Sequence, residues 1–268
     1  MPPPFTVRVI YVVPKDAEPW GETKQRAADW LADIQWFFAD EMDRLGYGPK
    51  TFQIAFDGGG AIGFHQFKAS ETKKQFEQDP RGSCKRVVGG RLRNQEDAEV
   101  CFFEAYSITH GVVSGDAART KRRRCYLSSL HLKLARREWL ASQDVYCGQV
   151  YPWIGQEPMQ SGTLSWNGRG PTLGDVSGAA FGVMAHELVH CFGPDDHTSD
   201  DDVRERKGNL MGKGFRGMRG YFRPDLTADR CVLSKKDAAL LSSSPFFAVR
   251  DLKPKPMSFY PTDTLVTL

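Results

Sequence analysis

The short stretch HELVHCFGPDDH, residues 186–197, restricts the fold and the chemistry of this chain more than any other feature. The residues before it have helical spacing, and Gly193 stands where a helix commonly ends in a left-handed residue. On such a helix, His186 and His190 lie one turn apart on the same face. Two imidazoles in this position can both bind one Zn²⁺, while Glu187 stands beside the ion without binding it. The stretch therefore predicts a metal site at the end of a helix.

The chemistry of such a site is hydrolysis. Zinc lowers the pKa of a bound water toward about 7, and Glu187 can then take the proton as the water attacks a carbonyl carbon. The HExxH pattern also arises by chance, in which case both histidines would be satisfied within an amphipathic helix. Three features argue against that alternative: the glycine that follows, the metal-competent side chains of Asp196 and His197, and Met211 in the short turn 209–212.

This combination resembles the metzincin clan of zinc peptidases, whose pattern is HExxHxxGxx followed by a histidine or an aspartate, and then a methionine-containing turn. The chain matches this pattern at His186, Glu187, His190, Gly193 and Met211. The Asp-His pair looks like the snapalysin type, and the upstream order of strand, long helix and strand is similar to that of secreted bacterial metallopeptidases. The resemblance implies a zinc-dependent metalloendopeptidase acting on a protein or peptide. In it, the two histidines bind zinc, Glu187 is the general base and Met211 lies beneath the metal.

Spacing leaves the third zinc ligand open between Asp196 and His197. Strict spacing from Gly193 lands on Asp196, whereas one inserted residue brings His197, the commoner ligand type in the clan, into place. Aspartate and neutral imidazole both bind zinc. We favour Asp196, because a turn fixed by Gly193 and Pro194 has little slack. His197 would then lie behind the ligands or face the substrate.

The chain departs from the clan two residues after the methionine, where some members carry a tyrosine that stabilises the transition state. Lys213 stands there, and Tyr221 is remote in sequence. Stabilisation of the developing negative charge is therefore left to Lys213, His197 or the zinc ion alone. Phe215, Met218 and Tyr221 are candidates for one wall of the substrate cleft.

The remaining sequence predicts an α+β fold, and the resemblance implies that it is of the zincin or metzincin type. Residues Thr6–Val13 are apolar and β-branched, which indicates a strand, and TFQIAFD at 51–57 indicates another. Apolar residues recur every three or four positions from 22 to 46, which indicates a long amphipathic helix. We expect a twisted mixed sheet backed by this helix and by the helix carrying His186, with a small irregular C-terminal lobe.

Domain organisation follows from this arrangement. We expect one catalytic domain over residues 1–268, with an upper lobe at about 5–193 and a lower lobe at about 194–268. The lower lobe would form one side of the substrate cleft.

Several segments are less clear. EVCFFEAYSIT at 99–109 suits a strand or a helix, and the spacing at 126–140 favours a helix. Ser177 or Asp175 can cap the start of the metal-site helix. We interpret the basic run Lys121–Arg124 as a solvated loop before a helix, with a phosphate-binding patch or a processing site as alternatives.

Composition is that of an ordinary globular protein, with 40% hydrophobic and 26% charged residues. The net charge of +3 is too small to indicate nucleic acid, and no apolar run reaches the length of a membrane span. We expect a monomer with neither nucleic acid nor a membrane as a partner.

No signal peptide is visible, so an extracellular location would require that one had been removed. The six cysteines include no CxxC pair, and the sequence is compatible with three disulfides or with six thiols.

Two other functions fit the same residues. A catalytically silent zinc-binding module would agree with the open third ligand and the missing tyrosine, whereas Glu187 argues against it. A metal-dependent hydrolase of a non-peptide amide would use the same site chemistry.

Overall fold

The structure is a computed structural model of the chain. It describes residues 5–89, 97–105, 117–118, 123–143, 172–196, 208–212, 214–226, 230–249 and 252. Within these ranges, no helix is both long enough and apolar enough to cross a membrane.

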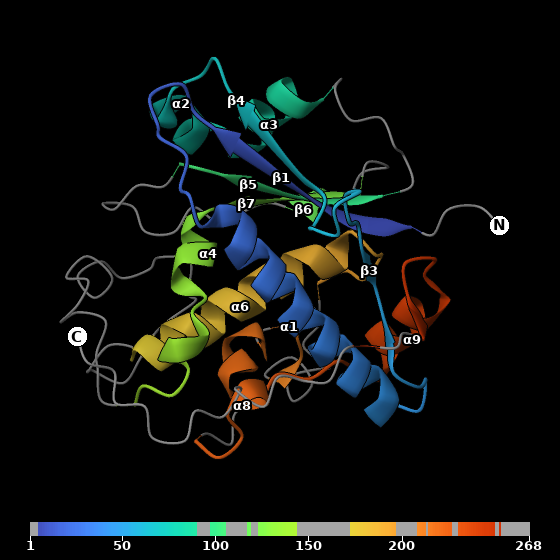
Figure 1. Cartoon of the computed structure of the whole chain (residues 1–268). Helices are drawn as coiled ribbons and strands as arrows, with labels where there is room; N and C mark the ends of the chain where they lie inside the picture. Colours follow the sequence, from blue (N-terminus) through green and yellow to red (C-terminus); the bar gives the residue numbers. More distant parts are fainter. Residues whose placement is uncertain are drawn as a thin grey trace.

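A mixed sheet forms the centre of the molecule (Figure 1). Its strands in spatial order are β3 (Gln53–Ile54), β1 (Thr6–Val13), β5 (Ala98–Phe103), β7 (Arg124–Ser128) and β6 (Ala117–Ala118), with β4 (Phe64–Lys68) also beside β1. All neighbours are parallel except β6, which runs antiparallel to β7. A separate antiparallel pair joins β2 (Lys50–Thr51) to β8 (Ala248–Val249). The strand predicted at Thr6–Val13 and the mixed sheet are confirmed.

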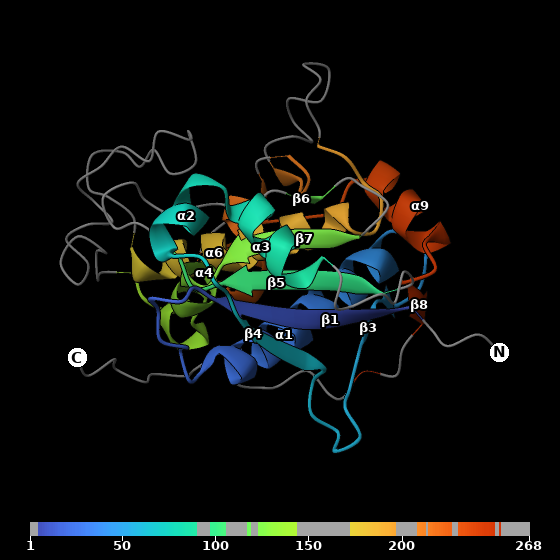
Figure 2. The ribbon, with the colours of Figure 1, turned by 90° about the horizontal axis from the view of Figure 1, so that it is seen from above.

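Helices cover both faces of this sheet. On one face lie α2 (Lys73–Gln78) and α3 (Pro80–Val88), as Figure 2 shows from above. On the other face lie α1 (Thr23–Arg44), α4 (Leu130–Leu134) and α6 (Leu173–His190). In the part of the chain that the structure describes, the remaining helical segments are η1 (Arg137–Trp139), η3 (Gly214–Gly217), α8 (Met218–Phe222) and α9 (Lys235–Ser243). Each face has its own hydrophobic cluster, and the larger one lies between the sheet, α1 and α6.

Helix α1 covers the sheet because one of its faces is apolar along its whole length. The fully enclosed side chains on that face are Ala27, Trp30, Leu31, Ile34, Phe37, Phe38 and Met42. Two acids share the buried side, and each pairs with an arginine: Asp33 with Arg137, and Glu41 with Arg44. Because a buried charge is costly unless it is paired, these contacts make the acids compatible with the core. The predicted long helix is confirmed.

The prediction of one strand over residues 51–57 is wrong, because the stretch is not continuous in one sheet. Thr51 pairs with Ala248 in the small sheet, whereas Gln53 pairs with Thr6 in the main sheet, so the stretch is divided between two partners. The chain then leaves the sheet, and Phe56, which is 60% exposed, forms only an isolated bridge to Ile62.

The helix predicted at 126–140 is also wrong in part. Its first residues belong to β7, whose side chains are nearly all buried, as expected for a strand covered on both faces. Only Leu130–Leu134 and the short η1 are helical. The alternating and helical patterns cannot be distinguished in so short an apolar run. The segment at 99–109 suited a strand or a helix, and its residues up to Phe103 belong to strand β5.

The interpretation of the basic run as a solvated loop is wrong for Arg124, which belongs to strand β7. Arg124 is 3% exposed and pairs with Glu99, its register partner on β5. The Arg123 guanidinium lies 4.9 Å from the ring centre of Phe5 and 5.0 Å from that of Phe246. An opposite charge thus replaces water around Arg124, whereas the half-buried Arg123 also contacts two aromatic faces.

The start of α6 differs from the predicted one. Thr172 is the N-cap, and it forms a capping box with Asp175, whose backbone N–H donates to the Thr172 hydroxyl. Ser177 lies inside the helix and donates its hydroxyl to the carbonyl oxygen of Arg136. The true cap precedes the predicted ones, so the helix includes more glycines than expected.

Buried His131 makes the stability of the fold depend on pH. Burial lowers its pKa from 6.5 to about 4, despite a contact of 3.1 Å between its Nδ1 atom and the Ser128 carbonyl oxygen. The unfolded chain therefore binds the proton more readily, so this contribution to stability is complete above about pH 6.5 and decreases as the pH falls toward 4. We expect a loss of roughly 3 kcal/mol over that interval, at about 1.4 kcal/mol per pH unit.

Guanidinium unfolding of the wild type and of His131→Gln between pH 7 and pH 4.5 measures this effect. The variant should show a shallower pH dependence, whereas His65→Gln on the outer strand β4 should behave as the wild type. Identical slopes for all three proteins would contradict the assignment.

Candidate metal centre

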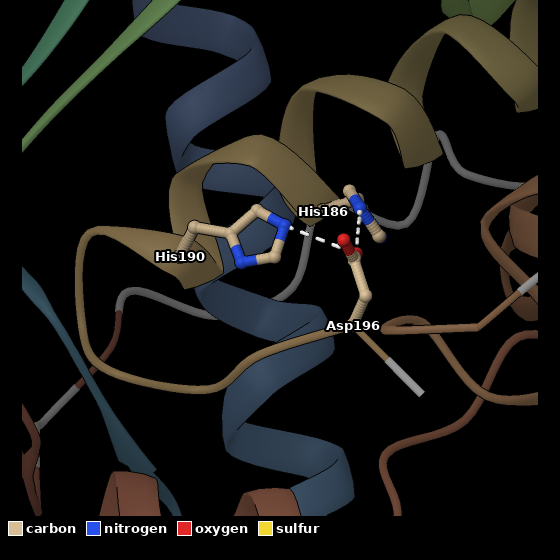
Figure 3. A group of neighbouring side chains, drawn as sticks. All are labelled: His186, His190 and Asp196. Carbon is tan, nitrogen blue, oxygen red and sulfur yellow. Dashed lines mark ion pairs between the residues drawn. The ribbon is translucent and has the colours of Figure 1, made fainter. Parts of the chain in front are cut away.

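The end of α6 places two imidazoles beside a chain that turns back. His186 and His190 lie on the last turns of the helix, which ends at His190. At Gly193 the backbone φ is +127°, a conformation that L side chains rarely adopt. The chain therefore reverses after the helix, and Asp196 lies opposite both rings (Figure 3).

One carboxylate oxygen of Asp196 faces both imidazoles. Oδ1 lies 3.1 Å from Nε2 of His186 and 3.2 Å from Nε2 of His190. The two rings are nearly perpendicular, at 88°, with centroids 4.8 Å apart. The side chains of His190 and His186 are 5% and 13% exposed, whereas Asp196 is 41% exposed. The group is thus enclosed on the helix side and open on the side of Asp196.

These donor atoms fit a tetrahedral zinc ion. One atom from each of His186, His190 and Asp196 lies within 4.8 Å of the others. Zinc bonds to imidazole nitrogen and carboxylate oxygen are about 2.0–2.2 Å long, which at tetrahedral angles puts two ligand atoms about 3.3 Å apart. The separations of 3.1 and 3.2 Å between oxygen and nitrogen agree with that value. Two nitrogens and one carboxylate oxygen are also a donor set that zinc accepts.

Main-chain carbonyl groups orient both rings. Nδ1 of His186 lies 2.8 Å from the carbonyl oxygen of Leu210, and Nδ1 of His190 lies 2.9 Å from that of Pro194. A carbonyl can only accept, so each Nδ1 atom carries the proton in these hydrogen bonds. The tautomer that results leaves Nε2 of each ring with a lone pair directed at the site.

The turn that supplies the Leu210 carbonyl is held by a buried asparagine. Asn209 is 1% exposed, and its Oδ1 atom accepts a hydrogen bond of 2.9 Å from the backbone N–H of Met211. The backbone N–H of Leu210 donates to the carbonyl of Val232, which fixes the same turn from the other side. Met211 is fully buried in the larger hydrophobic cluster. The turn therefore cannot move away from His186 without loss of several contacts.

Glycines on one face of α6 let the next segment approach the helix closely. A Cβ atom at Gly182 would lie 1.8 Å from the carbonyl oxygen of Phe215, and one at Gly178 would lie 2.6 Å from Cβ of Arg219. No side chain fits at either position. The close approach brings the ring of Phe215 to 5.5 Å from the ring of His186. Backbone proximity thus determines what lies beside the first histidine.

The electrostatics around His186 agree with a cation site. Burial opposes protonation of His186, but the protonated ring can donate from Nε2 to Asp196 and from Nδ1 to the Leu210 carbonyl, and these hydrogen bonds outweigh burial, so the pKa of His186 is raised. The surroundings therefore favour positive charge at this point. Glu187 is half-buried beside the histidines, and its Oε2 atom has almost no accessible surface.

Of the predicted site residues, the structure brings together His186, His190 and Asp196. His197 and Lys213 lie outside the described residues, so their predicted roles remain predictions.

Two predicted cleft residues belong to the core. Met218 is fully buried, and Tyr221, 5% exposed, donates its hydroxyl to Oδ2 of Asp40 on α1 at 2.6 Å. The Tyr221 ring packs edge-on against Phe37. Their placement in the cleft wall is therefore wrong, because Met218 lies inside the hydrophobic core and Tyr221 is held against α1. Phe215 does lie beside His186.

Sequence reasoning missed the groups that orient the rings. Carbonyl groups carry no residue-specific signal, so neither Leu210 nor Pro194 could be chosen in advance. The asparagine two residues before Met211 did carry a signal, since Asn side chains commonly accept a hydrogen bond from a backbone N–H two residues on.

Comparison with solved structures shows the fold. The chain resembles OgpA from Akkermansia muciniphila, with a TM-score of 0.54 and 18% identity over 92% of this chain and 62% of OgpA. Catalytically inactive OgpA in complex with an O-glycopeptide substrate, glycodrosocin, gives a TM-score of 0.53 and 17% identity over 91% of this chain and 62% of that one. The chain thus spans less than two thirds of the OgpA chain.

A weaker likeness is to archaemetzincin from Methanopyrus kandleri, with a TM-score of 0.39 and 11% identity over 90% of this chain and 97% of that one. A TM-score this low does not establish a shared fold. No protein-family model matches the sequence, and no curated protein sequence matches it either.

Loss of the Asn209 side chain should weaken metal binding. In Asn209→Ala the Met211 N–H loses its acceptor, and the Leu210 carbonyl is no longer fixed opposite His186. We expect a decrease in zinc affinity of about tenfold or more, the usual effect of removing a group that supports a ligand. Competition with a chelator measures the affinity.

The matched control is Ser177→Ala, which removes another buried polar group, but near the start of α6. It should reduce stability while leaving zinc affinity unchanged. If Asn209→Ala bound zinc as tightly as Ser177→Ala, Asn209 would have no role at the site.

Proposed function

We propose that this protein is a zinc-dependent metalloendopeptidase. The observation that carries the proposal is the convergence of His186, His190 and Asp196 at the end of the helix that also carries Glu187. The surroundings direct both Nε2 atoms and one carboxylate oxygen to the same point. Hydrolysis requires a general base beside the metal, and the carboxylate of Glu187 stands next to the ligands without being one of them.

In this proposal the ligands, the carbonyl groups behind them and Glu187 have separate roles. Zinc, when bound, polarises a carbonyl group and makes water acidic enough to lose a proton near neutral pH. His186, His190 and Asp196 hold the ion, and the Leu210 and Pro194 carbonyls keep the imidazoles in the ligand tautomer. Glu187 takes the proton from the attacking water and passes it to the leaving amine.

The substrate in this proposal is a peptide or protein chain. The open side of the site, where Asp196 is 41% exposed, gives access to a main chain. OgpA, which shares the fold, has been crystallised with an O-glycopeptide. We therefore propose O-glycosylated peptides as one substrate class to test beside unmodified ones. The residues after Gly193 would form the lower lobe of a single catalytic domain.

Replacement of the proposed base should abolish catalysis and keep the metal. In Glu187→Gln we expect kcat for cleavage of casein, or of an O-glycosylated mucin-type peptide, to fall by about 10²- to 10⁴-fold. Zinc content, measured by mass spectrometry, should remain at about one per chain.

Glu77→Gln, on helix α2 across the sheet, is the control and should retain full activity. Zinc binding without cleavage of either substrate by the wild type would identify a catalytically silent module instead. Cleavage of small amides but of neither peptide would indicate a hydrolase of non-peptide amides. A wild type that takes up no zinc would end the proposal altogether.

The third ligand can be tested by a pair of alanine variants. Because the Asp196 carboxylate faces both imidazoles, Asp196→Ala should weaken zinc binding by about 100-fold or more, as expected for loss of a ligand. His197→Ala should change it by no more than a few-fold. The reverse order would assign the ligand to His197.

A further inference from the structure

Helix α6 carries a row of residues at every fourth position that ends in the two imidazoles. The members of the row are Gly174, Gly178, Gly182, His186 and His190. This spacing keeps them close to one face of the helix. The segment of η3 and α8 lies along the glycine part of that face, and the turn that orients the first imidazole comes shortly before this segment. The contacts that fix the segment along α6 therefore also bear on the metal centre.

The side chain of Arg219, on α8, links this segment to the start of α6. Its Nη1 atom donates to Oδ1 of Asp175 at 2.8 Å and to the Thr172 hydroxyl at 3.4 Å, and these two residues form the capping box of the helix. Its Nε atom donates to the carbonyl oxygen of Leu140 at 3.0 Å, and Nη2 donates to that of Ser142 at 2.9 Å. The residue is 7% exposed. One buried guanidinium thus binds four groups on two separate stretches of the chain.

The backbone of Arg219 contacts α6 as well. A Cβ atom at Gly178 would lie 2.7 Å from the backbone nitrogen of Arg219, and one at Gly174 would lie 2.7 Å from its guanidinium carbon. Both glycines therefore leave the space that this arginine occupies. Since main chain and side chain are both held, the segment cannot slide along α6 without loss of several contacts.

The same segment is joined closely to the turn behind the metal centre. The backbone N–H of Gly214 donates to the carbonyl oxygen of Asn209 at 2.8 Å, and a Cβ atom at Gly214 would lie 2.1 Å from the carbonyl carbon of Gly208. From Gly214, η3 and α8 follow each other directly as far as residue 222. A displacement at Arg219 is therefore transmitted to the turn, and with it to the Leu210 carbonyl.

The chemistry of the guanidinium restricts the geometry more than it raises the stability. Desolvation offsets most of the attraction within a buried ion pair, so the pair of Arg219 and Asp175 adds little net stability. The N–H groups of a guanidinium form a rigid fork, and they are satisfied only by acceptors in one arrangement. That arrangement is the one in which Nδ1 of His186 lies 2.8 Å from the Leu210 carbonyl oxygen.

We propose that Arg219 is a positioning residue for the metal centre, an inference that rests on the zinc site proposed above. It binds the first turn of α6, whereas both imidazoles lie on the last turns. Its effect on zinc passes through the segment of η3 and α8 to the Leu210 carbonyl, and from there to the ring of His186. Without this link, α6 can shift against the turn, and Nε2 of His186 is directed at the site for less of the time.

Replacement of the fork by a single ammonium group tests the proposal. In Arg219→Lys the charge remains, but one amine cannot reach all four acceptors. We expect zinc affinity, measured by competition with a chelator, to fall by about threefold to thirtyfold, as for residues that influence a site without contacting its ligand. In proton NMR spectra of the metal-free protein, the Nδ1–H signal of His186 should move upfield, because its hydrogen bond to the Leu210 carbonyl is weakened.

The matched control is Arg137→Lys. The Arg137 guanidinium also donates twice to a buried acid, but that acid is Asp33 on α1. This variant should lose stability, while its zinc affinity and its His186 signal stay at the wild-type values. If Arg219→Lys bound zinc as tightly as Arg137→Lys, or lost affinity with an unchanged His186 signal, the proposal would be overturned.

A double variant shows whether the effect passes through the turn. Asn209→Ala releases the same carbonyl group, so the combination with Arg219→Lys should lower zinc affinity by less than the product of the two separate factors. A loss equal to the full product would mean that Arg219 acts by another route, which contradicts the proposal.

If Arg219→Lys does not fold, Asp175→Asn weakens the same contact from the other side and keeps the size of the capping side chain. It should lower zinc affinity, whereas its control Asp33→Asn should not, and equal affinities would again overturn the proposal. All of these measurements are made without a substrate. A protein that binds zinc but cleaves no peptide therefore contradicts the peptidase function alone, whereas a wild type that binds no zinc contradicts both.

Discussion

The candidate metal centre depends on how closely the main chain can approach α6. Gly178 and Gly182 let the segment that begins at Gly214 lie against the helix with no side chain between the two backbones. This contact fixes Phe215 beside the first histidine, and the preceding turn then presents the Leu210 carbonyl to Nδ1. A Cβ atom at Gly182 would overlap the Phe215 carbonyl and push both groups away. The orientation of His186 is thus a result of backbone packing.

Buried charges connect the layers around this contact. Asp33 and Glu41 join α1 to distant parts of the chain through arginines, and Glu99 pairs with Arg124 between neighbouring strands. Such pairs add little net stability, because desolvation offsets most of the attraction. Their geometric demands are strict, however, and removal of one partner would leave a buried charge. They therefore favour one arrangement of α1 and the sheet over others.

How much the sequence predicted depended on the length of each pattern. The long apolar face of α1 and the β-branched run of β1 were predicted correctly, because many residues repeat the same period. The segment at 126–140 failed because a strand and a short helix follow each other within a few apolar residues. His186 and His190 could be identified because helical spacing is a local property. Long-range packing was not visible, so Tyr221 was placed in a cleft although it binds Asp40.

Both ring nitrogens that point away from the site use main-chain acceptors, at positions 194 and 210. Every amino acid supplies a carbonyl oxygen, so a replacement at either position keeps the acceptor as long as the backbone path is unchanged. The metal centre therefore depends on the backbone path at these two positions, and since Leu210 is fully buried and Pro194 is buried as well, a replacement must also fit the space around it.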